Sequence, residues 1–433
     1  NLMFMRKIII KIFFACILQF NTVHALSLED AIIESLANNL NLKLENSNLE
    51  IAEEDVFQSK ASFLPTISLT GSISETETSN IISQSGISSS DYELSPSSKS
   101  IILSQTLFNG FGRTYNLESS KAEYELQKLN ILKTKQDVIL ETIEAYFSTL
   151  IAEKSLRSYE DNLKTVSERF ESTKKEFEVG LASKTDVAQS ESYMNTAKID
   201  FLNAKIKYKN IKNSFQDLVG TEAANLLFSN INSILPESYE EFRDLVMKNN
   251  LSILMARTNL NIKTSNVNSA KSAYYPKVDL TASKSELKEY TSLIDTLSTE
   301  ELKATISWPI FNSGKSLSTV RQAEKMKNSY FILLQKTQQD TLTLASDIWE
   351  KYIIGKDTIL AADLSYIASK TAFEGTKIEQ EVGERTVLDV LNARQSVLNA
   401  EIQFFNEQKN QEVIKAQVMY LAGILNLNNI GGI

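Results

Sequence analysis

Long stretches without glycine or proline predict most of the secondary structure. Residues 113–179 contain neither residue type, and residues 315–382 contain only Gly355 and Gly375. Both stretches are rich in Leu, Lys, Glu, Ala and Gln, so they predict helices. At about 1.5 Å per residue, the first helix would be roughly 100 Å long, which exceeds an ordinary globular helix. The same argument predicts helices over residues 26–64, 181–219, 237–275 and 384–422.

The longest of these stretches carries a coiled-coil pattern. Its apolar stripe steps by 3, 4, 3 and 4 residues, which is the spacing that drives left-handed winding of helices. We expect the partners to be residues 181–219 and 384–422, folded back at Gly180 and Gly383. Glycine suits the left-handed backbone that ends a helix. The stripe and its copy in the second half comprise Leu156, Tyr159, Leu163, Val166, Phe170, Ile359, Ala362, Tyr366, Ser369 and Phe373.

Four short segments instead have a period of two, at about residues 66–75, 99–108, 277–284 and 301–309. Apolar side chains alternate there with polar ones, which is typical of a barrel strand with an apolar outside and a polar lumen. We expect residues 80–98 and 284–300 to connect the strand pairs. Four strands cannot close a membrane barrel, because the smallest have about eight. Two or three identical chains would have to share one barrel; the alternative is a small soluble sheet packed on the helices.

The sequence also repeats itself. A shift of 211 residues aligns Asn38-Asn39-Leu40 with Asn249-Asn250-Leu251, and a shift of 203 aligns Val179-Gly180 with Val382-Gly383. Glycine and proline landmarks coincide along with the apolar positions, so duplication is favoured over chance similarity of composition. The predicted organisation is a first repeat over 26–220, a linker over 221–236, a second repeat over 237–423 and a tail over 424–433.

The first 25 residues have the pattern of a secretory signal. Basic residues flank the start of an apolar run that ends at Leu18, and Val23-His24-Ala25 is a small-x-small cleavage site. Residues 1–25 are therefore predicted to be a signal peptide that directs the protein out of the cytoplasm. The alternatives are a buried N-terminal helix and lipid attachment at Cys16.

Composition then excludes several kinds of chemistry. The single cysteine, Cys16, and the single histidine, His24, both lie in the predicted signal. The mature chain would have no disulfide, thiol or histidine chemistry, and neither a zinc site nor a histidine-based triad. Its formal charge would move from −9 to −12, which disfavours nucleic-acid binding. The 54 acidic residues are typical of solvated coiled-coil faces, so we expect no enzyme, metal or cofactor.

Together these features resemble the TolC-like outer membrane efflux protein family, also called outer membrane factors. The motif Val-Gly-x-x-(Ser/Thr)-x-x-Asp-Val occurs over residues 179–187 and again over 382–390. Residues 63–69 are similar to the family's approach to its first strand. Residues 108–112 and 311–314 are similar to its return from strand to helix.

The resemblance implies a mainly α fold with a small β part. Long coiled-coil helices would form an α-barrel, and four strands per chain would enter a shared 12-stranded transmembrane β-barrel. It implies a homotrimer in the lipid of the bacterial outer membrane that extends into the periplasm. There it would meet a periplasmic adaptor (membrane fusion) protein and an inner-membrane pump. The implied function is the exit duct of a tripartite efflux pump or type I secretion system, gated at its periplasmic end.

Two other functions compete with this reading. A structural coiled-coil filament or surface fibre would account for the helices, but such a subunit has no need of four lipid-compatible strands at equivalent repeat positions. A secreted hydrolase would require paired acids in a globular cleft, which the long helices disfavour.

The resemblance also assigns residues. Asp186 and Arg385 would link neighbouring coiled coils and hold the entrance closed, with Thr185 and Gln380 as further gate residues. Gln380 replaces an aromatic hydroxyl partner of the family's gate. The alternative is that Asp186 and Arg385 are solvated charges on helix faces.

Further residues are assigned to the pore and to docking. Asp389 would face the lumen, and three copies would form a carboxylate ring that selects cations. Asn392 stands where the family often has a second acid, so cation block should be weaker. The segments Val179-Gly180-Leu181 and Val382-Gly383-Glu384 would be the tips where the adaptor docks.

Overall fold

The computed structural model describes the chain apart from residues 1–25, 80–85, 87–91, 232–234, 292–293 and 431–433. The predicted signal peptide, with Cys16, lies outside the described residues. The chain forms two compact units. We call the described residues of 1–43, 133–250 and 340–433 the helical unit, and those of 44–132 and 251–339 the sheet unit.

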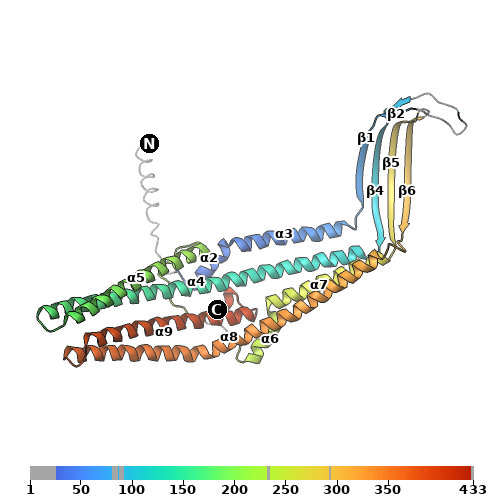
Figure 1. Cartoon of the computed structure of the whole chain (residues 1–433). Coiled ribbons are helices and arrows are strands. Elements are labelled where there is room, and N and C mark those ends of the chain that lie inside the picture. The colour runs from blue at the N-terminus through green and yellow to red at the C-terminus, as the bar shows by residue number, and fades with distance from the viewer. Residues whose placement is uncertain (1–25, 80–85, 87–91, 232–234, 292–293, 431–433) are drawn as a thin grey trace, which may run out of the picture. The chain divides into compact units, whose positions relative to one another are not determined.

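Helices flank two blocks of strands along the chain (Figure 1). None of the helices in the described part of the chain combines the length and the hydropathy needed to cross a membrane. In chain order the elements are α2 (Leu28–Asn38), α3 (Leu40–Ala61), β1 (Thr66–Ile73), β2 (Thr76–Thr78), β3 (Tyr92–Leu94), β4 (Ser97–Asn109), α4 (Gly112–Glu178), α5 (Lys184–Val219), α6 (Tyr239–Asn249), α7 (Leu251–Lys271), a 3₁₀ turn (Ser272–Tyr274), β5 (Lys277–Thr291), β6 (Ile294–Ser307), α8 (Lys315–Glu381), α9 (Val387–Leu421) and α10 (Leu427–Ile430).

The long helices follow the composition of their segments. α4 and α8 each contain 67 residues, and α5 and α9 follow them after short turns. The predicted coiled-coil stripe is buried or half-buried along its whole length, with Val166 and Ala362 as its most buried members. The stripe prediction is therefore confirmed.

The prediction of one uninterrupted helix over residues 26–64, and of another over 237–275, is wrong. The first breaks at Asn39 and the second at Asn250, where ψ is 120° and 123°. Asn39 accepts a hydrogen bond from the backbone of Leu42 at 3.0 Å, and the Asn250 amide donates to the carbonyl of Leu421 at 3.0 Å. Asparagine side chains compete in this way with helical hydrogen bonds, so a helix can end without glycine or proline.

The core of the helical unit includes the predicted linker and tail. Leu226 and Ile231 of the linker and Leu425 of the tail are buried against α2, α4, α5 and α9. The hydroxyl of Tyr146, at the centre of this core, donates to the carbonyl of Leu227 at 2.8 Å and accepts from its backbone N–H at 3.2 Å. The described residues between the repeats thus contribute to the packed core of the unit.

The sheet unit contains one antiparallel sheet with the order β1-β4-β5-β6, and β2 pairs with β3. β5 and β6 are longer than predicted, and most of the expected connection over residues 284–300 is strand. Charged residues replace apolar ones in this part of the alternation. Lys284 pairs with Glu300 across the two strands at 2.5 Å, so a search for apolar alternation stops too early.

The two faces of the sheet differ in polarity, as the alternation predicts. Register places Ile67, Leu103, Ala282 and Leu302 side by side on one face. On the other face hydroxyls align across strands, as in Ser72 and Ser98, whose oxygens lie 2.8 Å apart. The sheet therefore has an apolar face and a hydroxyl-rich face.

The two halves share a backbone signature before their long helices. Two consecutive residues have positive φ, namely Gly110-Phe111 before α4 and Ser313-Gly314 before α8. These pairs are equivalent under the shift of 203 residues, although glycine takes the first place in one and the second in the other. The side chains of Asn109 and Asn312 each accept a backbone N–H four residues on, at 3.3 Å. The repeat therefore persists in backbone geometry where the residues differ.

Candidate functional site

The two hairpin tips have the same backbone geometry, and both belong to the helical unit. Gly180 and Gly383 have φ of 81° and 86°, as their predicted role in ending the helices requires. Leu181 donates its backbone N–H to the carbonyl of Glu176 at 2.7 Å, and Glu384 donates to Glu379 at 2.8 Å. These bonds close the last turns of α4 and α8 and fold each chain segment sharply back.

The tips are exposed and largely apolar. Val179, Leu181 and Val382 are 71%, 81% and 70% exposed, and Glu384 is exposed as well. Neither Gly180 nor Gly383 has an atom within 4 Å of the position that a Cβ would occupy. The predicted docking residues therefore present a small, accessible surface that another backbone can approach closely.

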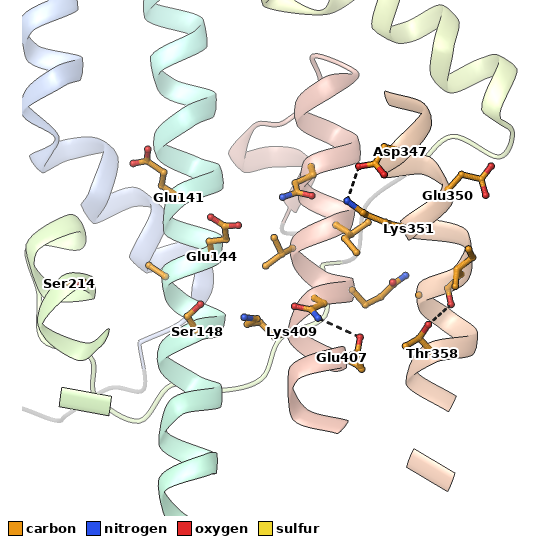
Figure 2. A pocket seen from close by; sticks show the side chains of 18 of the residues that line it. Glu141, Glu144, Ser148, Ser214, Asp347, Glu350, Lys351, Thr358, Glu407 and Lys409 are labelled. Atoms are coloured by element: carbon orange, nitrogen blue, oxygen red, sulfur yellow. Dashed lines mark hydrogen bonds and ion pairs between the residues drawn. The ribbon is translucent and has the colours of Figure 1, made fainter. Parts of the chain in front are cut away.

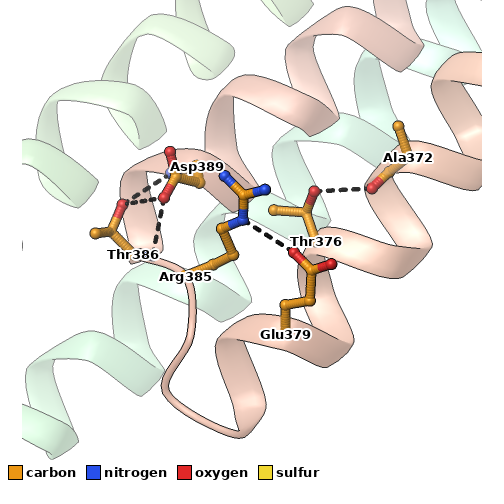
Figure 3. Close-up of polar contacts among 6 residues, drawn as sticks. All are labelled: Ala372, Thr376, Glu379, Arg385, Thr386 and Asp389. Carbon is orange, nitrogen blue, oxygen red and sulfur yellow. Dashed lines mark hydrogen bonds and ion pairs between the residues drawn. The ribbon is translucent and has the colours of Figure 1, made fainter.

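Asp186 and Asp389 occupy equivalent positions in two capping boxes. The Asp186 carboxylate accepts from the backbone N–H and the hydroxyl of Ser183 at 2.8 and 2.7 Å, and Ser183 Oγ accepts from the Asp186 N–H. Asp389 and Thr386 repeat this pattern at 2.9 and 2.8 Å (Figure 3). Hydrogen bonds from the backbone and hydroxyl of the cap hold the pKa of each carboxyl below its usual value. Each carboxylate therefore fixes the start of a helix as well as carrying charge.

The two predicted gate charges have other partners within the chain. Arg385 donates Nε to Glu379 at 2.9 Å across the second tip (Figure 3). Asp186 is held by Ser183, and the contacts of the described chain do not join it to Arg385. Thr185 is exposed in the first turn of α5, and the Gln380 carbonyl accepts from Gly383 at 3.0 Å.

Asn392, the predicted neighbour of Asp389 at the constriction, connects the two hairpins. Its Oδ1 accepts a hydrogen bond from the hydroxyl of Tyr193 on α5 at 2.7 Å. The sequence interpretation missed Tyr193, although a signal existed. Ser190, Tyr193 and Ala197 are spaced by 3 and 4 residues, and Ser190 and Ala197 are buried. It also missed Arg394, which contacts α4 from α9.

A cavity of about 840 Å³ lies among α4, α5, α8 and α9 in the helical unit (Figure 2). Five of its seven charged residues are acidic, and Lys351 is paired with Asp347 at 2.7 Å. This excess of acids disfavours anions in the cavity. Among the described residues, no three His, Cys, Asp or Glu are grouped so as to hold a metal ion. The charged residues of the cavity are Glu141, Glu144, Asp347, Glu350, Glu407, Lys351 and Lys409.

A family model described as "Outer membrane efflux protein" matches residues 31–221 and 243–423. The outer membrane efflux protein BepC of Brucella suis is 24% identical over 407 residues, which cover 94% of this chain and 87% of BepC. The alkaline protease secretion protein AprF of Pseudomonas aeruginosa is 23% identical over 67% of this chain and 62% of its own length.

The fold is also similar to solved structures. The Campylobacter jejuni CmeC outer membrane channel superimposes with a TM-score of 0.83 at 19% sequence identity. The match covers 92% of this chain and 85% of the CmeC chain. The arrangement of two helical hairpins and four strands is thus that of a known outer membrane channel fold.

Proposed function

The chain belongs to the outer membrane efflux protein family, and from this we propose that it is an outer membrane channel that serves as the exit duct of an efflux pump or a type I secretion system. Three copies form the channel. The sheet units supply twelve strands to one barrel in the outer membrane lipid, and the helical units form a tunnel in the periplasm. A periplasmic adaptor and an inner-membrane pump complete the system.

The main support for the proposal is that the four-stranded sheet in the described part of one chain has open edges and an exposed apolar face. In the described chain, β1 and β6 each pair with one strand only, so both edges of the four-stranded sheet are open. Its apolar residues are also uncovered, with Leu69, Ile73 and Leu302 between 75% and 84% exposed. Further copies close such edges, and lipid covers such a face. A filament subunit would need neither.

Exposed apolar residues on the helices of the sheet unit support association of several copies. On α3, Ile51 and Phe57 are 60% and 65% exposed, and Phe331 and Ile332 are exposed on α8. Large apolar side chains left exposed in a single chain often mark contacts with other chains. We assign these surfaces to contacts between the three chains.

The tunnel closes at the hairpin tips in this proposal. Arg385 of one chain pairs with Asp186 of its neighbour, and this link holds the entrance shut, with Thr185 and Gln380 beside it. Three copies of Asp389 form a carboxylate ring at the constriction, which favours cations. The exposed apolar tips receive the adaptor, and an adaptor that binds the open state more tightly shifts the channel toward it.

Purification of the full chain from a Gram-negative host tests this function. We expect recovery with the outer membrane, a detergent-solubilised mass of three chains, and cation-preferring pores in planar bilayers. Intact mass will also show whether processing occurs after Ala25 or leaves a lipid on Cys16. Recovery in the soluble periplasm, or as a monomer in mild detergent, would contradict the proposal.

Two matched variants test the orientation of the sheet. Leu69 lies on the apolar face and Thr70, the next residue, lies on the hydroxyl-rich face. Leu69→Lys should reduce membrane assembly, because a lysine facing lipid costs about 2–4 kcal/mol near the bilayer centre. Thr70→Lys should assemble normally and lower cation conductance. Equal assembly of both variants would argue against a lipid-facing apolar surface.

A further inference from the structure

Arg394 joins three helices of one chain close to the predicted constriction. It lies on α9 two residues after Asn392, and its side chain is only 12% exposed. Nη2 donates to Asp161 Oδ2 at 2.7 Å and Nε donates to Asn162 Oδ1 at 3.2 Å, both on α4. The guanidinium carbon lies 5.7 Å from the centre of the Phe373 ring on α8. We call Arg394, Asp161 and Asn162 the Arg394 clamp.

The clamp belongs to a wider contact between the two hairpins. The Tyr193–Asn392 hydrogen bond crosses from α5 to α9. Beside it, Val166 of α4, Ala197 of α5 and Leu391 of α9 form a buried apolar cluster. We call α4 and α5 the first hairpin and α8 and α9 the second hairpin. Within one chain, an ion pair, two hydrogen bonds to asparagine oxygens and apolar packing therefore join the two hairpins.

The repeat shows that the boundary between neighbouring chains has no equivalent of this contact. Under the shift of 203 residues, Arg394 corresponds to Glu191 and Asp161 corresponds to Leu364. In a closed ring of alternating first and second hairpins, the boundary between two chains brings the equivalent positions together. That boundary has an acid and a leucine where the boundary within a chain has an ion pair. At these positions, the contact within a chain is therefore stronger than the contact between chains.

We propose that Arg394 is a positioning residue of the gate, which holds the two hairpins of one chain together so that opening separates neighbouring chains. This inference rests on the proposed channel function. The Asp161 carboxylate is 67% exposed, but the guanidinium is only 12% exposed and donates to a second acceptor on α4, so the clamp does not rest on a surface ion pair alone. The Arg385–Asp186 link between chains is then the contact that an adaptor has to break.

Single-channel conductance of four variants tests the clamp. Arg394→Gln should raise the ratio of open to closed channels by about tenfold, because losing one charge-assisted hydrogen bond would let the two hairpins of a chain separate while the link between chains stays in place. Combining Arg394→Asp with Asp161→Arg restores a pair of opposite charges and should restore closure, whereas Arg394→Asp alone should not. The matched control is Arg157→Gln, because Arg157 pairs with Glu153 inside α4 and does not cross between hairpins.

The outcomes separate the clamp from the channel function. If Arg394→Gln conducts like Arg157→Gln, or if the charge-swapped pair behaves like Arg394→Asp, the clamp is wrong while the channel stands. If neither the wild type nor the Arg385→Ser variant forms pores, the proposed function itself fails. If Arg394→Gln forms no trimer while the swapped pair does, the clamp serves assembly rather than gating, and the inference is also overturned.

Discussion

Four glycines with positive φ allow the stability of the hairpins to be separated from the function of their tips. Gly180 and Gly383 lie at the tips with open space around them. Gly220 and Gly423 lie after the ends of α5 and α9, with φ of 86° and 70°. A Cβ at Gly423 would lie 2.3 Å from the backbone oxygen of Asn249, so substitution there requires the backbone to move. A Cβ at Gly220 would meet only the movable side-chain amide of Asn38, at 2.7 Å.

These distances give a graded expectation for four alanine substitutions. Gly180→Ala and Gly383→Ala should each cost about 1 kcal/mol, the strain of alanine with positive φ. Gly423→Ala should cost about 3 kcal/mol, because overpacking against backbone adds to that strain. Gly220→Ala should fall between them. Midpoints of guanidinium unfolding, followed by helical circular dichroism in detergent, measure the order.

The tip variants should show the opposite order in function. Gly383→Ala should fold almost as well as the wild type, yet its methyl group would stand where an adaptor backbone approaches the tip. We expect it to impair adaptor-dependent export more than Gly220→Ala does. A Gly423→Ala protein as stable as Gly383→Ala would refute the steric argument, and full export by Gly383→Ala would refute docking at this tip.

Four further results are expected at the tips. Asp389→Asn should lower the preference of the pore for cations in reversal-potential measurements; an unchanged preference would remove Asp389 from the lumen. Arg385→Ser should raise the closed-channel conductance, and an equally closed channel would refute its gate assignment. Ser183→Ala should lower stability by about 1 kcal/mol through loss of the cap. Because the pKa of Asp186 is lower in the folded chain, its cap stabilises the fold above the unfolded value of about 3.9 and is lost as the pH falls through the folded value. Acid titration should therefore destabilise the wild type more than Asp186→Asn, and parallel curves would contradict this.

Local pattern was sufficient to predict most of the elements. Periodicity of 3.5 and 2 residues, together with the absence of glycine and proline, predicts the long helices and the cores of the four strands. Such periodicity does not predict the structure where polar side chains form the hydrogen bonds or ion pairs that end a helix or extend a strand. Asn39 and Asn250 end helices through side-chain hydrogen bonds, and Lys284 and Glu300 extend a strand pair through an ion pair.

The candidate site was only partly predictable, because its contacts join distant parts of the chain. Arg394 and Asp161 are 233 residues apart, and their contact depends on the relative register of two hairpins. No local pattern fixes that register. The tip glycines, in contrast, were predictable because a sharp helical turn requires a left-handed residue at one known position.

Asp186 and Asp389 show why a motif locates a residue without fixing its role. Each is the acid of a capping box, so the spacing Ser/Thr-x-x-Asp is already required by the start of a helix. The same carboxylates remain available to a second chain, because a cap uses only part of their hydrogen-bonding capacity. The structure shared by the two halves does not require an arginine at position 385 or 394, since the equivalent residues in the first half are Ala182 and Glu191. Asymmetry between the halves, rather than the shared motif, therefore identifies the residues that distinguish one hairpin boundary from the other.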